Sequence, residues 1–410
     1  MKKLISIVLS AALLFGISAS LTSCGENREE VLKIYMPGEY IDEDILEEFS
    51  AWYKGQTGKT VTVTVKAFDA VEDILKAVEQ NKSDYDLLVP SDYMVEYLVK
   101  KDLVKPVNKS IIDITEAGLF KEAYIESTRE FDPELKYSVP YMYGTLGLVY
   151  DMTKTGKKID SWDALFGDEF KGTNPVRRSV KDSIRDTYVA ACLYNESAVL
   201  NTLSGAEKKA KVQSIFEDTS AETIEKAKNT LSAFKAGGAR WDVDDLKFEM
   251  AAGSSDVAVA LMWSCDAGYV MNDYDDNDGN KQSGNRNLWY VVPKEGGNVY
   301  IDSFVISKYA ANEEAANYFL KFLCQKDIAV KNSDYAGCIS PVAAAYDELL
   351  DYYTDDTANE GLFDGTAEGW KEMFIEMMFP SEETLNRCGV MKDFGAGKDA
   401  VVKMWGNVKG

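Results

Sequence analysis

The sequence has 410 residues, with 45 Lys and Arg against 68 Asp and Glu, a net charge of −23, and no histidine. The length is sufficient for two or three domains, and the missing histidine excludes a Ser-His-Asp triad, a histidine general base and an imidazole metal site. The negative charge disfavours nucleic acid as a partner, because phosphate would be repelled, and it favours small cations at long range.

The first 23 residues are typical of a bacterial lipoprotein signal peptide. A short basic start precedes an apolar run over residues 4–21, and Leu21-Thr22-Ser23-Cys24 supplies a branched residue, two small residues and the cysteine that receives the lipid. A signal anchor is the alternative, since the run approaches the length that spans a bilayer. Cleavage before Cys24 leaves 387 residues with a net charge of 43 − 68 = −25. We expect residues 24–30 to be a polar tether and lipid on Cys24 to hold the protein at the cell envelope.

From residue 31 onward, strand and helix patterns alternate. Strands are predicted for residues 31–35, 61–65 and 85–89, and helices with one apolar face for residues 41–58, 71–80 and 94–101. This β-α-β-α-β order predicts a parallel sheet with helices on its faces. Further strands are predicted for residues 145–150 and 257–262, and further helices for residues 184–194, 221–234 and 313–323.

Two acidic segments, residues 273–287 and 346–367, are expected to be a loop and a surface excursion. The first resembles a calcium-binding loop, but Tyr274 stands where the first ligand should be and Asn285 where the closing glutamate should be. The lysine-rich residues 206–211 are expected to form a solvated helical face. Because the calcium-loop pattern fails, we expect no bound metal, and we expect no other cofactor.

Five cysteines follow Cys24, and an odd number cannot all be paired. They are Cys192, Cys265, Cys324, Cys338 and Cys388. None lies in a Cys-x-x-Cys pair, and Cys192 and Cys324 have the apolar neighbours of buried thiols. One disulfide is possible, but the sequence does not assign its partners.

Aromatic and acidic residues occur together near the ends of predicted strands. These places are Glu39-Tyr40, Pro90-Ser91-Asp92-Tyr93, residues 137–144, residues 263–267 and residues 293–303. Open parallel sheets bind ligands at the carboxyl ends of their strands. An ammonium group needs acceptors, which carboxylates supply, and each aromatic face attracts a cation by roughly 0.5–2 kcal/mol. This combination fits a linear polyamine, which alternates ammonium groups with methylenes.

Other interpretations of these residues remain open. Tyrosine and tryptophan at strand ends are often core residues, Asp92 could cap a helix, and Trp241-Asp242 could lie at the surface. Asp266 and Asp302 are harder to explain in this way, since each follows an apolar strand beside an aromatic residue.

At these residues the chain resembles the spermidine/putrescine-binding proteins of bacterial ABC transporters, within the type II periplasmic solute-binding proteins. The segments that carry the resemblance are residues 85–93 (YDLLVPSDY), 137–147 (YSVPYMYGTLG), 161–165 (SWDAL), 263–267 (WSCDA) and 293–303 (PKEGGNVYIDS). The resemblance runs over almost the whole mature chain. It implies an α/β fold of two lobes, each a mostly parallel sheet flanked by helices, with the ligand in the cleft between them.

The resemblance also implies boundaries, partners and a function. Residues 31–142 and 266–308 would form the N-terminal lobe, and residues 143–265 and 309–410 the C-terminal lobe. The protein would be a monomer without enzymatic activity that binds a polyamine and delivers it to the permease subunits of an ABC importer. Closure of the lobes would present the bound ligand.

The ligand-binding residues implied by the resemblance are Glu39, Tyr40, Ser91, Tyr93, Tyr143, Asp186, Trp241, Trp263, Asp266, Tyr300 and Asp302. The sequence departs from the relatives at three places. Pro37-Gly38 replaces Trp-Thr, Ser183 stands where an Asp is frequent, and Ile339 stands where a polar residue is frequent. These departures leave putrescine, spermidine and another amine open as the ligand.

Two other functions remain as alternatives. A binding protein for thiamine, a sugar or ferric ion is one, and Tyr352-Tyr353 are reminiscent of an iron site. The other is a secreted hydrolase that uses a pair of carboxylates, although no such pair can be distinguished from acids that bind a ligand.

Overall fold

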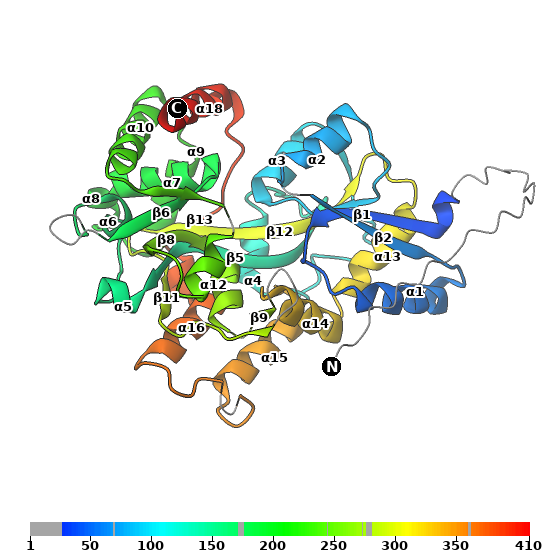
Figure 1. Cartoon of the computed structure of the whole chain (residues 1–410). Helices are drawn as coiled ribbons and strands as arrows, with labels where there is room; N and C mark the ends of the chain where they lie inside the picture. Colours follow the sequence, from blue (N-terminus) through cyan, green and yellow to red (C-terminus); the bar gives the residue numbers. More distant parts are fainter. Residues whose placement is uncertain are drawn as a thin grey trace, which may run out of the picture.

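The computed structural model of the chain describes residues 27–68, 70–170, 176–243, 245–272, 274–275, 281–359 and 362–410. The predicted signal peptide, Cys24 and part of the acidic loop at residues 273–287 lie outside these ranges. Two lobes lie side by side, and the strands β5 (Ser138–Asp151) and β12 (Gly297–Ser307) run between them (Figure 1). Across the described ranges, none of the helices is long and apolar enough to cross a membrane.

The N-terminal lobe begins with the predicted strand and helix alternation. Strand β1 (Val31–Pro37) pairs in parallel with β2 (Thr62–Phe68) and β3 (Leu87–Leu88). The connecting helices are α1 (Asp44–Thr57), the short α2 (Asp73–Leu75) with the π-helical turn η2 (Lys76–Gln80), and α3 (Asp92–Lys100). Helix α1 buries Ile45, Phe49 and Tyr53, which recur every four residues, and it ends at Gly58, whose φ of 75° is left-handed.

The two crossing strands make the centre of the sheet antiparallel. The strand order is β2-β1-β3-β12-β5-β8-β6-β7, in which β12 pairs antiparallel with β3 and β5, and β5 antiparallel with β8 (Val257–Trp263). Strands β6 (Arg177–Lys181) and β7 (Arg240–Asp242) continue in parallel. Strands β4 (Val104–Lys105), β11 (Leu288–Val291) and β13 (Cys388–Gly389) pair with β12 or β5. The sheet is thus mixed, because each crossing strand enters one lobe against the local strand direction.

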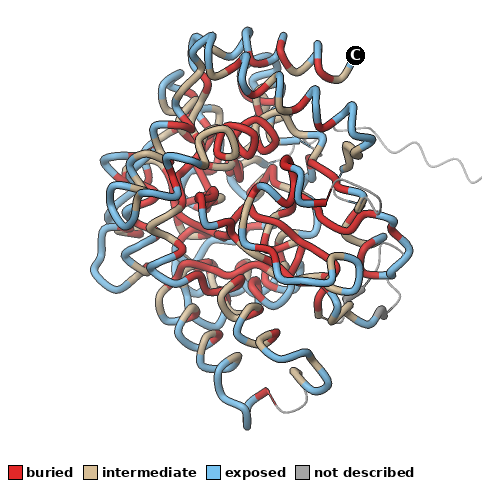
Figure 2. Tube along the Cα trace, turned by 90° about the vertical axis from the view of Figure 1, so that its left-hand side faces the viewer, coloured by how far each residue is buried: buried red, intermediate tan, exposed pale blue. Residues whose placement is uncertain are grey.

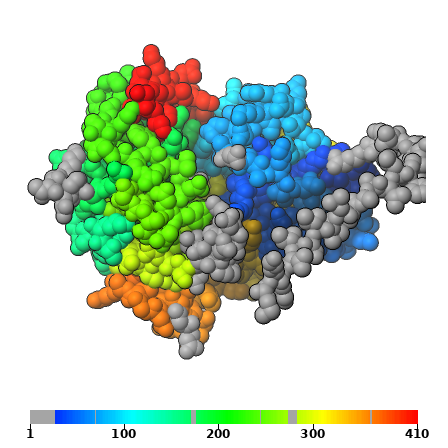
Figure 3. Space-filling view, in the orientation of Figure 1, coloured from blue at the N-terminus to red at the C-terminus, as the bar shows by residue number. Residues whose placement is uncertain are grey.

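Helices cover both sides of each lobe. In the N-terminal lobe, α2 and α3 lie on one side of the sheet, and α1 and α13 (Glu313–Leu323) lie on the other (Figure 1). The C-terminal lobe has α7 (Ile184–Asn195), α9 (Gly205–Glu217), α10 (Ala221–Ala236) and α18 (Lys398–Lys409) on one side, and α12 (Ser264–Met271) and α16 (Trp370–Met378) on the other. Figure 3 shows the two lobes against each other as filled surfaces.

The remaining elements are mostly short. They are η1 (Arg28–Glu30), α4 (Glu122–Thr128), α5 (Met152–Thr155), α6 (Asp163–Phe166), α8 (Ser197–Leu200), α11 (Leu246–Ala251), β9 (Tyr274–Asp275), β10 (Lys281–Gln282), α14 (Lys326–Ala336), α15 (Ala343–Thr354), α17 (Glu382–Leu385) and η3 (Gly395–Gly397). Helix α15 covers the first part of the predicted surface excursion.

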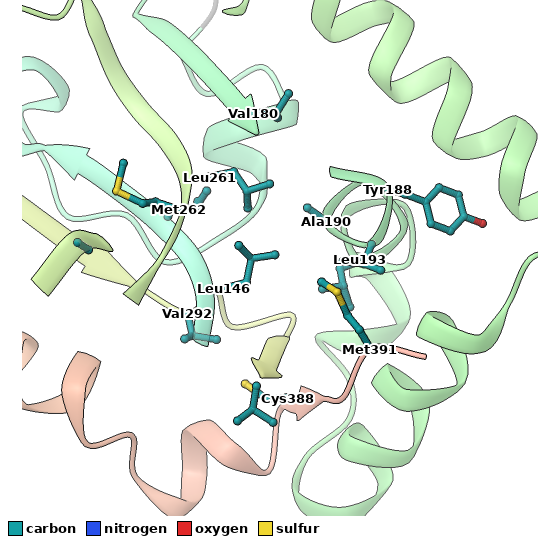
Figure 4. Packing of buried hydrophobic residues seen from close by; sticks show 14 of the residues in the cluster. Leu146, Val180, Tyr188, Ala190, Leu193, Leu261, Met262, Val292, Cys388 and Met391 are labelled. Carbon is teal, nitrogen blue, oxygen red and sulfur yellow. The ribbon is translucent and has the colours of Figure 1, made fainter. Parts of the chain in front are cut away.

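The core follows the crossing strands, in which every residue except Asp302 is buried. Figure 2 shows the buried segments gathered in the interior of the molecule. All fourteen residues of β5 are buried. In the C-terminal lobe, Leu146 of β5 and Leu261 of β8 pack with Leu193 of α7 (Figure 4). The burial of a strand on both faces explains why its sequence has no simple alternation.

The packing of α12, α13 and α14 differs from the predicted lobe boundaries. The resemblance places residues 266–308 in the N-terminal lobe, yet Ala267 and Val270 of α12 and the strand β11 pack with the C-terminal lobe. The resemblance places residues 309–410 in the C-terminal lobe, yet the rings of Phe319 in α13 and Phe49 in α1 lie 4.9 Å apart, and Ile328 and Ala329 of α14 belong to the same apolar cluster. After β12 the chain therefore remains with the N-terminal lobe for two helices, because α13 covers the apolar face of α1.

A buried carboxylate holds the beginning of β5. The Asp132 side chain accepts hydrogen bonds from the backbone N–H groups of Lys136, Tyr137 and Ser138 and from the Ser138 hydroxyl, at 2.8–3.1 Å. Asp132 is 1% exposed. Because one carboxylate accepts from several donors in the turn, it fixes the direction in which the crossing strand leaves that turn.

Candidate ligand-binding site

One wall of the site belongs to the N-terminal lobe and centres on Asp302 of β12. The Tyr40 hydroxyl donates a hydrogen bond of 2.7 Å to Asp302 Oδ2, and the Tyr141 hydroxyl donates one of 2.6 Å to the Tyr40 carbonyl. The strand register shifts between Asp302 and Ser303, which places Asp302 at an irregularity. Burial raises the pKa of Asp302 to about 6, although hydrogen bonds from Tyr40 and Ser91 act in the opposite direction.

A buried carboxylate, Asp92, lies beside this wall. Ser91 is the cap of α3, and Asp92 is its first helical residue, so the helix-cap interpretation of Asp92 is wrong by one position. Asp92 is 1% exposed, its Oδ1 accepts from the Tyr93 N–H at 2.7 Å, and its Oδ2 has no hydrogen-bond partner among the described residues. Burial raises the pKa of Asp92 well above its usual value, and the negative charges of Asp302 and Asp186 add to that effect.

The other wall belongs to the C-terminal lobe. Trp263 ends β8, and its ring packs edge-on against that of Tyr300 with 4.7 Å between centroids. Asp266, in the first turn of α12, contacts two ammonium groups: Lys247 Nζ lies 2.6 Å from Oδ1 and Lys181 Nζ lies 3.6 Å from Oδ2. Burial alone would raise the pKa of Asp266, but the two lysines outweigh it and lower the pKa. Lys181 Nζ also lies 5.7 Å from the centre of the Trp263 ring.

A small pocket opens beside this pair of lysines. It is lined by Val180, Lys181, Asp242, Val243, Leu246, Leu261, Met262 and Asp266. The walls of the pocket thus combine an apolar floor from β6 and β8 with the charged groups around Asp266.

An arginine links the two lobes. Arg185, in the first turn of α7, has its guanidinium carbon 3.8 Å from the ring centre of Tyr93 and 4.0 Å from that of Phe394. Tyr93 belongs to the N-terminal lobe, and its hydroxyl donates to Glu72 at 3.2 Å. The Arg185 Nε is buried and has no hydrogen-bond partner among the described residues. Arg185 therefore fills an aromatic slot of the kind that attracts cations.

A disulfide lies under the C-terminal wall. It joins Cys265, at the start of α12, to Cys338, which follows α14, with 4.9 Å between the Cα atoms. The Tyr300 hydroxyl donates to Cys265 Sγ at 2.7 Å. The two cysteines are 73 residues apart, so the sequence alone does not predict that they pair.

Most of the predicted residues converge on these walls. Tyr40, Ser91 and Asp302 are joined by hydrogen bonds. Trp263 and Tyr300 are in ring contact, and Asp266 is next to Trp263. Tyr93 and Asp186 lie in the first turns of α3 and α7, which face each other through Arg185.

Three predicted residues do not join this set. Tyr143 is buried in the core, where its hydroxyl donates to the Met378 carbonyl at 3.0 Å. Trp241 packs edge-on against Trp405 of α18, with 5.0 Å between centroids. Glu39 is exposed in a turn, with a left-handed φ of 53°.

Sequence reasoning also misses four residues of the site. It places Asp92 in a strand-end segment but does not include it among the ligand-binding residues, and it does not single out Lys181, Arg185 or Lys247. Arg185 directly precedes the predicted Asp186 in the first turn of α7, so its position in the sequence could have indicated that it belongs to the site. Among the side chains that the structure describes, no cluster of three acidic or cysteine residues could hold a metal ion.

Comparison with known proteins gives consistent matches over most of the chain. Residues 48–361 match the family described as bacterial extracellular solute-binding protein. The putrescine-binding periplasmic protein SpuD of Pseudomonas aeruginosa is 24% identical, with 98% of this chain and 97% of that relative covered. The spermidine/putrescine-binding periplasmic protein of Escherichia coli is also 24% identical, with the same coverage.

Solved structures share the fold. The spermidine/putrescine substrate-binding protein PotD of Streptococcus pneumoniae matches with a TM-score of 0.67 at 25% identity, covering 93% of this chain and 98% of that one. A putative spermidine/putrescine ABC transporter protein from Listeria monocytogenes matches with a TM-score of 0.68 at 24% identity, covering 93% and 99%. The two-lobed arrangement described above is therefore that of the type II periplasmic binding proteins.

Proposed function

Since the chain belongs to the bacterial extracellular solute-binding proteins, we propose that it binds a polyamine, putrescine or spermidine, between its lobes and delivers it to the permease of an ABC importer. The names of its relatives support a polyamine. The observation that carries the proposal is the N-terminal wall, where the half-buried Asp302 lies beside the buried Asp92 and Tyr40 donates to Asp302.

Two neighbouring carboxylates with raised pKa values, one buried and one half-buried, are suited to an ammonium ligand. A cation placed between them lets both ionise, because it supplies the charge and the donors that the fold does not. The half-buried ring of Trp263 on the opposite wall, which packs edge-on against Tyr300, offers an apolar face to methylene groups. Closure of the lobes around β5 and β12 would exclude water from these contacts.

We infer that the protein acts at the cell envelope, held by lipid on Cys24. The relatives are named as periplasmic, which supports export. A monomer fits this role, since one cleft with two walls binds one ligand. Another solute, such as thiamine or a sugar, is the second candidate, and nothing in the site favours a hydrolase over a binding protein.

Calorimetric titration of the mature chain with putrescine, spermidine, thiamine and glucose tests the proposal. Heat with a polyamine alone supports it, and no heat with either polyamine at millimolar concentration contradicts it. Asp302→Asn should weaken polyamine binding by about 2 kcal/mol, the scale of a lost charged hydrogen bond. Asp102→Asn is the matched control, because Asp102 is an exposed carboxylate of the same lobe paired with Lys308.

A further inference from the structure

A strap of chain, residues 390–397, joins β13 to α18 and is fixed to the C-terminal lobe. Gln213 of α9 holds its beginning through two hydrogen bonds with the backbone of Val390, at 2.9 and 3.1 Å. Near its other end, the ring of Phe394 packs edge-on against Tyr188 of α7, with 5.6 Å between centroids. In Figure 1 the strap is the red thread that descends from α18 on the side of the C-terminal lobe facing α3. Any contact of the strap with the N-terminal lobe is therefore a contact between the lobes.

Two residues of the strap bind the N-terminal lobe. The backbone N–H of Asp393 donates to Glu96 Oε2 of α3 at 2.9 Å. The Lys392 ammonium donates to the backbone carbonyl of Glu130, in the turn between α4 and β5, and lies 3.2 Å from a carboxylate oxygen of the same residue. The Arg185 guanidinium of α7 donates to the Lys392 carbonyl, which holds the strap in position. Each of these contacts involves a charged group, and the Lys392 side chain is only 13% exposed.

Neighbouring elements of the C-terminal lobe touch the same side of α3. Arg185 lies against the ring of Tyr93, and Lys398, the first residue of α18, has its Nζ 5.9 Å from the ring centre of Tyr97. Tyr93, Glu96 and Tyr97 are spaced by three and four residues, so they lie on one face of the helix. One face of α3 thus receives the strap, α7 and α18.

The same helix contributes to the ligand-binding wall, at a different place. Ser91 and Asp92 stand at its start beside Asp302, whereas Glu96 and Tyr97 lie about one turn further along. The strap contacts use none of the carboxylates assigned to the ligand ammonium. They can therefore form without a ligand, and they are lost when the lobes separate by a hinge motion about β5 and β12.

We propose that the strap acts as a latch, whose contacts with α3 and with the turn between α4 and β5 hold the lobes closed. The ligand-free protein then populates the closed form, and a bound polyamine leaves slowly. The inference rests on the proposed polyamine-binding function of the same cleft, and it adds a control of closure that the ligand does not make. The chain supplies part of the free energy of closure and the ligand supplies the rest, so a few contacts shift the two populations several-fold.

A double variant, Glu96→Ala with Lys392→Met, removes the strap contacts and leaves the ammonium-binding residues in place. In small-angle X-ray scattering of the ligand-free mature protein, we expect a larger radius of gyration for the variant than for the wild type. A saturating polyamine should make the two values equal. In stopped-flow measurements, the dissociation rate of putrescine or spermidine should rise about tenfold in the variant, the scale of one or two lost charged hydrogen bonds.

The matched control is a second double variant, Glu126→Ala with Lys226→Met. It also removes one glutamate and one lysine, so the net charge is the same. The ion pairs that it breaks, with Arg129 and Glu222, each lie within one lobe. Its radius of gyration and its dissociation rate should equal those of the wild type.

A charge exchange separates the latch from a defect of folding. Glu130→Lys places a second ammonium against Lys392 and should open the ligand-free protein, because like charges repel. Adding Lys392→Glu restores an ion pair of reversed sign and should recover part of the compaction. A general loss of structure would not be repaired by the second substitution.

The scattering measurement needs no ligand, so the two proposals fail separately. Equal radii of gyration for the ligand-free wild type and the first double variant overturn the latch, as do an unchanged dissociation rate or a charge exchange that restores nothing, and polyamine binding then stands. If neither polyamine binds at millimolar concentration, the polyamine function is overturned, and the scattering comparison still decides whether the strap holds the lobes closed.

Discussion

The fold holds the carboxyl group of Asp302 where ionisation is unfavourable. Burial raises the pKa from 3.8 to about 6, so the folded state binds this proton more tightly than the unfolded state does. The stabilising contribution of the protonated group is fully present below pH 3.8 and is lost as the pH rises through 6. The full rise in the pKa of Asp302 corresponds to about 3 kcal/mol of free energy of unfolding. We take about 2 kcal/mol, because the side chain keeps some contact with solvent.

Replacing Asp302 by Asn removes the charge and keeps an acceptor for the Tyr40 hydroxyl. The ligand-free variant should be more stable than the wild type by about 2 kcal/mol at pH 7.5 and by about half as much at pH 5, since the wild-type carboxyl is then largely protonated in the folded state. Urea unfolding of the ligand-free mature protein at the two pH values measures both differences. The same substitution should weaken amine binding, so stability and binding should change in opposite directions.

Two results would refute this reasoning. One is a variant less stable than the wild type at pH 7.5, and the other is an equal increase in stability at both pH values. Asp102→Asn serves as the control in this assay as well, because its ion pair with Lys308 lowers the pKa of Asp102. A group with a lowered pKa stabilises the protein above its unfolded pKa, so loss of this charge should not stabilise the protein at pH 7.5.

Three further predictions concern single contacts. Tyr40→Phe removes the 2.7 Å hydrogen bond to Asp302 and should weaken the binding of an amine ligand by about 1 kcal/mol, as measured by calorimetry. Unchanged affinity would place Asp302 outside the site. Replacing Cys265 and Cys338 by Ser removes the disulfide that closes a loop of 73 residues, and it should lower the free energy of unfolding by about 4 kcal/mol in oxidising buffer. In reducing buffer the variant and the wild type should be equally stable. Asp132→Ala leaves several buried donors unpaired and should destabilise the protein by about 3 kcal/mol in urea, whereas a loss below about 0.5 kcal/mol would show that water replaces the carboxylate.

The sequence predicts the local elements well because their signals are local. The alternation from β1 to α3 follows from apolar spacing, and α13 has the predicted bounds, Glu313–Leu323. Strand pairing is not a local property, so the sequence does not reveal that β12 lies between β3 and β5. For the same reason the predicted lobe boundary is misplaced at α13, since only the tertiary contact with α1 assigns that helix to the N-terminal lobe.

The candidate site is predicted in part, for a comparable reason. Tyr40 and Asp302 are 262 residues apart, and only the resemblance to known proteins associates them before the structure brings them within 2.7 Å. Lys181 and Lys247 lie outside the aromatic motifs in the sequence, and nothing in their surroundings marks them as partners of Asp266. Tyr143 is placed differently from the prediction because every residue of β5 is buried, so the sequence gives no sign of which face a side chain takes.

The position of β12 has a consequence for the order in which the molecule can fold. The strand lies between β3 and β5, and α13 and α14 pack with the same lobe, so the N-terminal lobe is completed by residues 297–336. During synthesis from the N-terminus, the sheet formed by β1, β2 and β3 cannot pair with β12 until β12 has been made. Contacts between residues so far apart in the sequence also form slowly. The proposed export benefits from this delay, because the earliest strands cannot close a lobe on their own.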